Sequence, residues 1–141
     1  MFENVRGKNS PIGVELMKKG LLTQSQVERV LDYQKNHRDM KFAEIVDVLD
    51  MCDKTDLLNA LAEKLKVTPA FLEDSVEVNP IEFLPRDIII NYRVLPFALE
   101  GNNLSVAFSD PLDESKVKEV ELLLMNQGFN MDIYVSLYTY I

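Results

Sequence analysis

Hydrophobic residues recur at helical spacing through the first half of the chain. An apolar face at Val27, Val30 and Leu31 predicts a helix from about 24 to 36. The start of this helix is placed by Thr23, which is followed three residues later by a glutamine in the spacing of a capping box.

A shorter helix is predicted before it. Ser10 is placed to cap the first turn, and Pro11 suits the first helical position, where a missing N–H costs nothing. Gly20 suits the left-handed residue that follows the end of a helix. The two predicted helices form one hairpin.

A second hairpin follows. Phe42, Ile45, Val46 and Leu49 form an apolar stripe, and Asp53 is placed to cap a fourth helix that carries several leucines. The first half of the chain is therefore predicted to contain four short helices in two hairpins.

The second hairpin is a displaced copy of the first. A shift of 30 residues aligns apolar residues at seven positions. The pairs are Ile12 with Phe42, Leu16 with Val46, Leu21 with Met51, Leu22 with Cys52, Val27 with Leu57, Val30 with Ala60, and Leu31 with Leu61. The glycines do not repeat, since Gly13 aligns with Ala43 and Gly20 with Asp50. Two explanations remain open, a structural helical bundle and a two-fold receptor for a two-fold ligand.

From Val67 the pattern changes to short apolar runs punctuated by proline. The segment PAFLE predicts a strand, and a short helix followed by a helix over about 86–92 is predicted next. VLPFALEGNNLSVAF predicts two strands joined at Glu-Gly-Asn-Asn. DPLDESKVKEVELLLMNQG predicts a helix that ends before Gly128, and NMDIYVSLYTYI predicts a further strand.

The predicted fold class is α+β. Residues 1–66 form a module of four short helices, and residues 67–141 form a small module with a few-stranded sheet and helices packed against one face. Charge separates the two modules as well. Residues 1–66 hold 11 Lys/Arg and 11 Asp/Glu, whereas residues 67–141 hold 4 and 12.

The composition is that of an ordinary globular protein. Of 141 residues, 47% are hydrophobic and 27% charged. No apolar run reaches the roughly 18 residues of a membrane helix, and the N-terminal MFENVRGKNS lacks the apolar region of an export signal. A cytoplasmic location without direct membrane insertion is expected. The net charge of −8 argues against a nucleic-acid polymer as partner.

Residues suited to catalysis are few. The single cysteine, Cys52, and the single histidine, His37, cannot build a disulfide or the usual zinc site, and Cys52 stands where the repeat has an apolar residue, as a small buried hydrophobic group. The five glycines include no P-loop. The acids of SDPLDES suit the first turn of a helix and lack the spacing of a calcium loop. Neither enzymatic activity nor a resident cofactor is therefore expected.

Two stretches carry a family resemblance. KKGLLTQSQVERVLDYQ and LPRDIIINYRVLPFALEGNNLSVAFSDPLD resemble the N-terminal domain of the ATPases that drive type II secretion and type IV pilus assembly, the MshEN or type II secretion system protein E N-terminal family. The resemblance extends from about Ser10 to Ile141. It implies a non-catalytic regulatory and docking domain that contacts a membrane-platform protein or the attached motor, at the inner face of the membrane through that partner.

The resemblance also implies an alternative function. In the family, two helical motifs together hold one cyclic di-GMP molecule, and their counterparts here are residues 11–34 and 41–64. The first motif lacks only its leading arginine, where Pro11 stands. The second has Lys41 in place of arginine, Ala43 and Asp50 in place of glycines, Asp47 in place of an apolar residue, and Lys64 in place of glutamine. The implied ligand-binding residues are Ile12, Gly13, Gly20, Leu21, Leu22, Gln34, Arg38 and Lys41.

Each of these residues also has a structural explanation. Gly13 suits a phosphate at a helix start or a close helix crossing, and Gly20-Leu21-Leu22 suits a ligand-facing turn or a helix C-cap. Gln34 suits a guanine edge or an exposed helical position, and Arg38 and Lys41 suit phosphates or solvated charges. The sequence leaves these alternatives open and does not identify the transport system.

Overall fold

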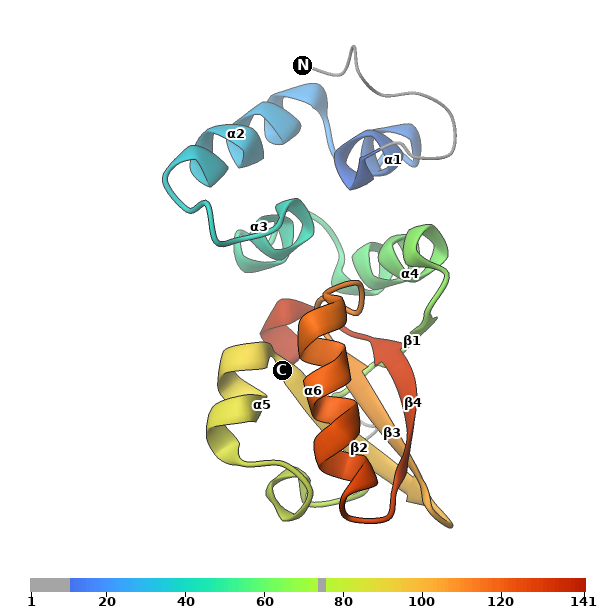
Figure 1. Ribbon diagram of the computed structural model, residues 1–141. Helices are drawn as coiled ribbons and strands as arrows, with labels where there is room; N and C mark the ends of the chain where they lie inside the picture. Colours follow the sequence, from blue (N-terminus) through green and yellow to red (C-terminus); the bar gives the residue numbers. More distant parts are fainter. Residues whose placement is uncertain (1–10, 74–75) are drawn as a thin grey trace. The chain divides into compact units, whose positions relative to one another are not determined.

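The chain divides into two compact units, and each is described by itself (Figure 1). The computed structural model describes residues 11–73 and 76–141. The division lies between Lys64 and Leu65, two residues before the boundary placed from composition.

The first unit consists of helices arranged as two hairpins. Their bounds are α1 Ile12–Lys18, α2 Gln24–Lys35, α3 Phe42–Val48 and α4 Lys54–Leu65. The second pair has the lengths of the first pair, 7 and 12 residues, and begins 30 residues later. The internal repeat predicted from apolar positions is therefore present in the helix boundaries.

Burial repeats in the same register. Leu16 and its counterpart Val46 are 0% and 1% exposed, and Val27 and its counterpart Leu57 are 0% and 1% exposed. Equivalent positions of both hairpins therefore supply the core. Helix α3 contacts both α1 and α2, so the two hairpins pack against each other. The apolar stripe is what defines the buried face of each helix.

The turn between the helices of each hairpin has the same hydrogen-bonding pattern. After α1, the N–H of Leu21 donates to Leu16 O at 2.9 Å and the N–H of Gly20 donates to Met17 O at 3.0 Å. These are the two bonds of a Schellman motif, in which the residue after the cap is left-handed. Gly20 has φ +75°.

After α3 the same two bonds recur without a glycine. The N–H of Met51 donates to Val46 O at 3.2 Å and the N–H of Asp50 donates to Asp47 O at 3.1 Å. Asp50 therefore adopts φ +53°, a conformation that a Cβ makes unfavourable. The second turn has kept the geometry of the first and lost its glycine.

Exchanging the residues at these two positions tests the conformational cost. Asp50→Gly is expected to raise the free energy of unfolding by about 0.5 kcal/mol, because relief of the left-handed strain exceeds the loss of an exposed ion pair. Gly20→Asp is expected to lower it by about 1 kcal/mol. Urea denaturation followed by far-ultraviolet circular dichroism measures both, and a destabilising Asp50→Gly would contradict the assignment of strain.

Side-chain caps begin the second helix of each hairpin as predicted. Thr23 Oγ1 accepts from the N–H of Gln26 at 3.2 Å, and the Thr23 N–H donates to Gln26 Oε1 at 2.8 Å. Asp53 Oδ1 accepts from the N–H of Asp56 at 3.1 Å. The predicted position of Pro11 is wrong by one residue, because Pro11 is the N-cap and α1 begins at Ile12. The predicted cap at Ser10 lies outside the described residues.

The second unit is a four-stranded mixed sheet with helices, which confirms the α+β class. Its elements are β1 Thr68–Pro69, the 3₁₀ helix η2 Pro80–Glu82, α5 Arg86–Tyr92, β2 Val94–Glu100, β3 Asn103–Phe108, α6 Glu114–Met125, β4 Asn130–Val135 and the 3₁₀ helix η3 Tyr138–Tyr140. The strand order is β1-β4-β3-β2, with β2 antiparallel to β3 and the other pairs parallel.

Two connections build this sheet. The predicted hairpin joins β2 to β3 through Gly101, which has φ +61°. Helix α6 connects the parallel strands β3 and β4 and is capped by Asp113, whose side chain accepts from the Lys116 N–H at 3.3 Å. Tyr92 donates its hydroxyl to Glu119 at 2.8 Å, which links α5 to α6 and raises the pKa of Tyr92.

Strand β2 lies at one edge of the sheet and is irregular. Its pairing with β3 shifts between Pro96 and Ala98, which leaves Phe97 as an extra residue. The Phe97 carbonyl accepts from the N–H of Glu77 at 2.6 Å. Proline fits here because an edge strand has one side without ladder bonds.

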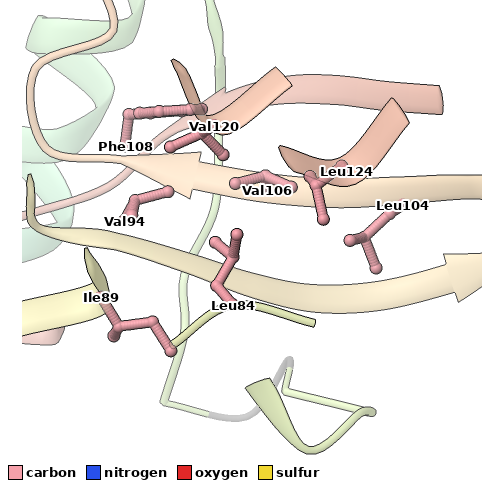
Figure 2. Packing of buried hydrophobic residues seen from close by; sticks show 8 residues of the cluster. All are labelled: Leu84, Ile89, Val94, Leu104, Val106, Phe108, Val120 and Leu124. Carbon is pink, nitrogen blue, oxygen red and sulfur yellow. The ribbon is translucent and has the colours of Figure 1, made fainter. Parts of the chain in front are cut away.

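Helices α5 and α6 cover one face of the sheet (Figure 1). Figure 2 shows the core between these helices and the sheet. Val94, Leu104, Val106 and Phe108 come from the strands, Val120 and Leu124 from α6, Ile89 from α5, and Leu84 from the segment before α5. The opposite face has a smaller cluster, made by Ala70, Leu72, Phe97 and Ala107 with Tyr134, Tyr140 and Ile141 packed against it.

Two strand predictions in this unit need correction. Strand β1 covers only Thr68–Pro69, not the whole of PAFLE, because Leu72 lies in a turn and packs into the smaller cluster. Strand β4 ends at Val135 instead of continuing through YTYI. The chain then turns so that Arg93 lies over the Tyr138 ring, 3.9 Å from its centroid.

Candidate functional site

The predicted ligand-binding residues all lie in the helical unit, in or beside α1, α2 and the start of α3. Gly13 is buried in the first turn of α1. A Cβ added at Gly13 would lie 2.9 Å from Phe42 Cζ, so the glycine allows the ring to pack directly against the helix backbone. Ile12, one residue before, is half-buried. Gly13 therefore has a packing role that the sequence analysis named as its structural alternative.

Gln34 and Arg38 lie together. They line an open depression of about 310 Å³ with Leu31 and Lys35 at the C-terminal end of α2. The side chains available there are an amide, an ammonium and a guanidinium beside an apolar wall. This combination suits an anionic group attached to a flat ring.

Hydrogen bonds hold the loop beside this depression. Gln34 is half-buried, not exposed, and its Nε2 donates to Met40 O at 3.0 Å. His37 stacks on Tyr33 with ring centroids 3.9 Å apart, and its Nδ1 lies 2.9 Å from Tyr33 O. Arg38 Nε donates to Lys35 O at 3.4 Å and its side chain is exposed. These contacts connect the loop to the C-terminal end of α2, and the exposed Arg38 side chain is bonded to the same end.

Leu21 lines a different depression. It contributes with Lys19 and four residues of α4, Asp56, Asn59, Ala60 and Glu63, to a space of about 280 Å³. Lys19 Nζ lies 3.0 Å from Glu63 Oε2 and joins the end of α1 to α4. Gly20 beside it is exposed, whereas Leu22 is only 5% exposed and belongs to the core.

Lys41 begins the second hairpin as the N-cap of α3. Its N–H donates to Glu44 Oε1 at 2.7 Å, which is the half of a capping box that the third helical residue supplies. The eight predicted residues therefore fall into separate environments. Gln34 and Arg38 share one depression, Leu21 lines another, and Gly13 and Leu22 pack inside.

An ion cluster at the second turn was missed by the sequence analysis. Lys54 Nζ lies 2.6 Å from Asp47 Oδ1, donates to Asp47 O at 3.0 Å, and lies 3.8 Å from Asp50 Oδ1. The Asp47 side chain is 1% exposed and that of Lys54 is 30% exposed. A carboxylate on the apolar stripe of α3, followed seven residues later by a lysine, was the available signal.

Cys52 adjoins this cluster and is half-buried, where full burial was expected. Burial raises the pKa of its thiol above the ordinary value of 9.0, and the carboxylates of Asp56 and Asp53 raise it further, while Lys54 opposes them. The thiol is therefore protonated at neutral pH and is a poor nucleophile.

Alkylation by iodoacetamide tests this environment. The rate at which iodoacetamide alkylates Cys52 is expected to increase with pH. The midpoint of this increase should lie above 9.0, the ordinary thiol pKa. Because Asp56 is the largest charge contribution, Asp56→Asn should move that midpoint to lower pH. The control is Asp32→Asn on an exposed face of α2. A midpoint below the ordinary value would contradict the negative environment.

Metal chemistry finds no support among the described residues. Across residues 11–73 and 76–141, no three His, Cys, Asp or Glu side chains gather in a way that could hold a metal ion. Over the same ranges, no helix has both the length and the apolar character needed to cross a bilayer.

A family model matches part of the second unit. Residues 68–128 match the model of the MshEN domain, which agrees over that range with the resemblance found in the sequence. No curated protein sequence gives a significant match to the chain.

Solved structures extend the similarity of fold to nearly the whole chain. The structure of MshE with cyclic di-GMP has a TM-score of 0.65 and 23% identity and covers 94% of each chain. The N-terminal domain of XpsE has a TM-score of 0.65 and 17% identity in one crystal form, covering 96% of this chain and 91% of that one. A second crystal form of the XpsE domain has a TM-score of 0.52 and 16% identity, and the match covers 92% of this chain and 88% of that one.

Proposed function

We propose, because residues 68–128 match the model of the MshEN domain, that the chain is a non-catalytic regulatory and docking domain of a type II secretion or type IV pilus assembly ATPase. Its partner is a membrane-platform protein or the motor itself. The observation that carries the proposal is the fold shared with the XpsE N-terminal domain over 96% of this chain.

The unequal net charge of the two units supports the second unit as the one that meets the partner. Residues 65–141 contain 5 Lys/Arg and 12 Asp/Glu, a net charge of −7, whereas residues 1–64 contain 10 and 11. An acidic surface of this kind steers a basic partner and sets orientation and association rate more than affinity. A basic patch on the platform protein is the complementary surface.

Binding to the cytoplasmic part of the cognate platform protein tests the proposal. The double variant Asp87→Asn/Glu114→Gln removes two exposed carboxylates of the second unit, and association measured by surface plasmon resonance is expected to slow about threefold or more at low salt. The control Glu28→Gln/Asp32→Asn removes two exposed carboxylates from α2 of the first unit and should slow association less. No binding by the wild type to either the platform or the motor overturns the proposal, and equal slowing by both variants removes the assignment to the second unit.

An alternative function is a cyclic di-GMP receptor that uses residues 11–34 and 41–64. Two observations favour it: the similarity of fold to MshE solved with this nucleotide, and the depression that contains Gln34 and Arg38. Calorimetry tests it. Saturation near one ligand per chain, weakened by Arg38→Ala and unchanged by the matched α2 control Arg29→Ala, supports the receptor, and an absence of heat at high ligand concentration excludes it.

A further inference from the structure

The two edges of the sheet differ in how their backbone groups are used. At the β2 edge, Pro96 has no N–H to offer and the Phe97 carbonyl is already bonded. At the other edge, the two residues of β1 pair only with the end of β4, at Tyr134 and Val135 (Figure 1). Within the part of the chain that the structure describes, residues 130–133 of β4 therefore have no strand on that side, and we call them the open edge.

The shortness of β1 has a local cause. Helix α4 ends at Leu65, and Lys66 takes the left-handed conformation that follows a helix, with φ +58°. Strand β1 begins only two residues later, at Thr68. The residues before β1 therefore form a helix end and its turn instead of a strand, so they do not extend the sheet along the open edge.

The hydrogen bonds at both ends of β4 show which side each backbone group faces. The Asn130 N–H donates to Asn102 O at 2.8 Å on the β3 side, whereas Val135 O accepts from the Ala70 N–H at 2.8 Å on the β1 side. Successive residues of a strand direct their N–H and C=O groups to opposite sides. Met131 therefore directs both groups to the open side, and no described residue bonds to either of them.

The side chains of the open edge alternate in character. Met131 packs against the core beneath α5 and α6, and Ile133, on the same face, is 38% exposed. Asp132 lies on the opposite face, is exposed, and has no ion pair with any described residue. An added strand would cover Ile133 with an apolar side chain and place a neighbouring residue beside Asp132. The open edge is therefore complementary to an extended segment in which apolar and basic residues alternate.

Charge separates the two kinds of strand that fit this edge. A second copy of the chain has the same net charge of −8 and brings its own acidic unit to the contact. A charged residue on an edge strand also disfavours such self-pairing. A basic segment is attracted instead, because residues 65–141 hold 5 Lys/Arg and 12 Asp/Glu. The charge therefore favours a basic partner over a second copy.

We propose that the open edge, residues 130–133 of β4, docks an extended basic segment of a partner protein as an additional strand. The segment pairs with the backbone of Met131 and places a lysine or arginine beside Asp132. In this mode of recognition the main-chain hydrogen bonds provide affinity and the alternate side chains provide specificity. The inference rests on the proposed docking function and names the surface that docks and the chemistry of its partner.

Amide hydrogen exchange of the full chain, followed by nuclear magnetic resonance, tests the proposal. In the free protein, the Met131 amide is expected to exchange about tenfold faster than the Asp132 amide, which faces β3. The probes are the peptide acetyl-Thr-Val-Lys-Val-Thr-amide and its counterpart with Glu in place of Lys. At millimolar concentration, the lysine peptide is expected to slow exchange at Met131 by about threefold, and the glutamate peptide is expected to leave it unchanged.

Two variants define the role of charge. Asp132→Lys should reverse the preference between the two peptides. Glu100→Lys changes the net charge by the same amount at an exposed position of β2, the opposite edge strand, and should preserve the preference for the lysine peptide. Circular dichroism checks that both variants are folded.

Three results overturn the inference: slow exchange of the Met131 amide in the free protein, no slowing by the lysine peptide, or equal slowing by both peptides. Binding to the platform protein is measured separately by surface plasmon resonance. Retained platform binding without any effect of the lysine peptide rejects the open edge and leaves the docking function in place. Protection of Met131 by the lysine peptide without binding to the platform or the motor rejects the docking function and leaves the edge as a peptide site.

Discussion

Replacing Lys54 with methionine is expected to lower the free energy of unfolding of the helical unit by roughly 3 kcal/mol. The variant removes an ammonium 2.6 Å from Asp47, whose side chain is 1% exposed. A carboxylate that is withdrawn from water loses an ammonium 2.6 Å away, so its desolvation is offset less than in the wild type. The estimate stays at the lower end of the usual range because Lys54 itself is 30% exposed.

A double-mutant cycle separates this effect from general damage to α4. In Asp47→Met/Lys54→Met the carboxylate is removed with its partner, and methionine is the residue that the first hairpin has at this position, Met17. The double variant should recover most of the lost stability. Urea denaturation followed by circular dichroism gives the free energies, and hydrogen exchange of residues 42–65 locates the change. A double variant as unstable as Lys54→Met would contradict the charge-pair explanation.

Replacing Phe108 with alanine is expected to lower the free energy of unfolding of the second unit by about 4 kcal/mol. Phe108 is 1% exposed and is the largest fully buried side chain among the described residues. Figure 2 shows it at the end of β3, close to Val120 of α6. Truncation leaves a cavity at the contact between the sheet and its covering helix, where neighbouring side chains collapse only partly.

The control for this substitution is Leu99→Ala on β2. Leu99 is 39% exposed, so its truncation should cost less than about 1 kcal/mol. Tyrosine fluorescence during urea denaturation reports the second unit, because four of the five tyrosines lie in residues 65–141. Similar losses for Phe108→Ala and Leu99→Ala would show that the strand–helix contact is less important than its burial indicates.

The elements that could be predicted from the sequence are those determined by neighbours in the chain. The capping box at Thr23, the cap at Asp53 and the hairpin at Gly101 each depend on residues within three or four positions, and each is present. The same holds for the helical repeat, since periodicity alone identifies the buried face.

The elements that could not be predicted depend on partners distant in the sequence. Strand β1 exists because two residues pair with Tyr134 and Val135, and nothing in PAFLE reveals that register. The boundary of β4 has the same origin, because the chain after Val135 is held by Arg93, 45 positions away from Tyr138. Local propensity does not contain this information.

The sequence names the residues of the candidate site without placing most of them in space. Gln34 and Arg38 lie together because both are near the end of one helix. The packing of Gly13 on Phe42 links two copies of the repeat, and the Asp47–Lys54 pair crosses a turn. Neither contact follows from spacing on a single helix, so the charges of the second turn could be listed from the sequence but not placed.

The irregular edge strand β2 has a consequence for the behaviour of the chain at high concentration. Pro96 offers no N–H to an incoming strand, the extra residue at Phe97 bends the ladder, and the Phe97 carbonyl is already bonded to Glu77. Another molecule cannot continue the sheet in register along this side. Growth of cross-β fibrils from the folded protein is thereby blocked at β2, although its apolar side chains would otherwise favour such stacking.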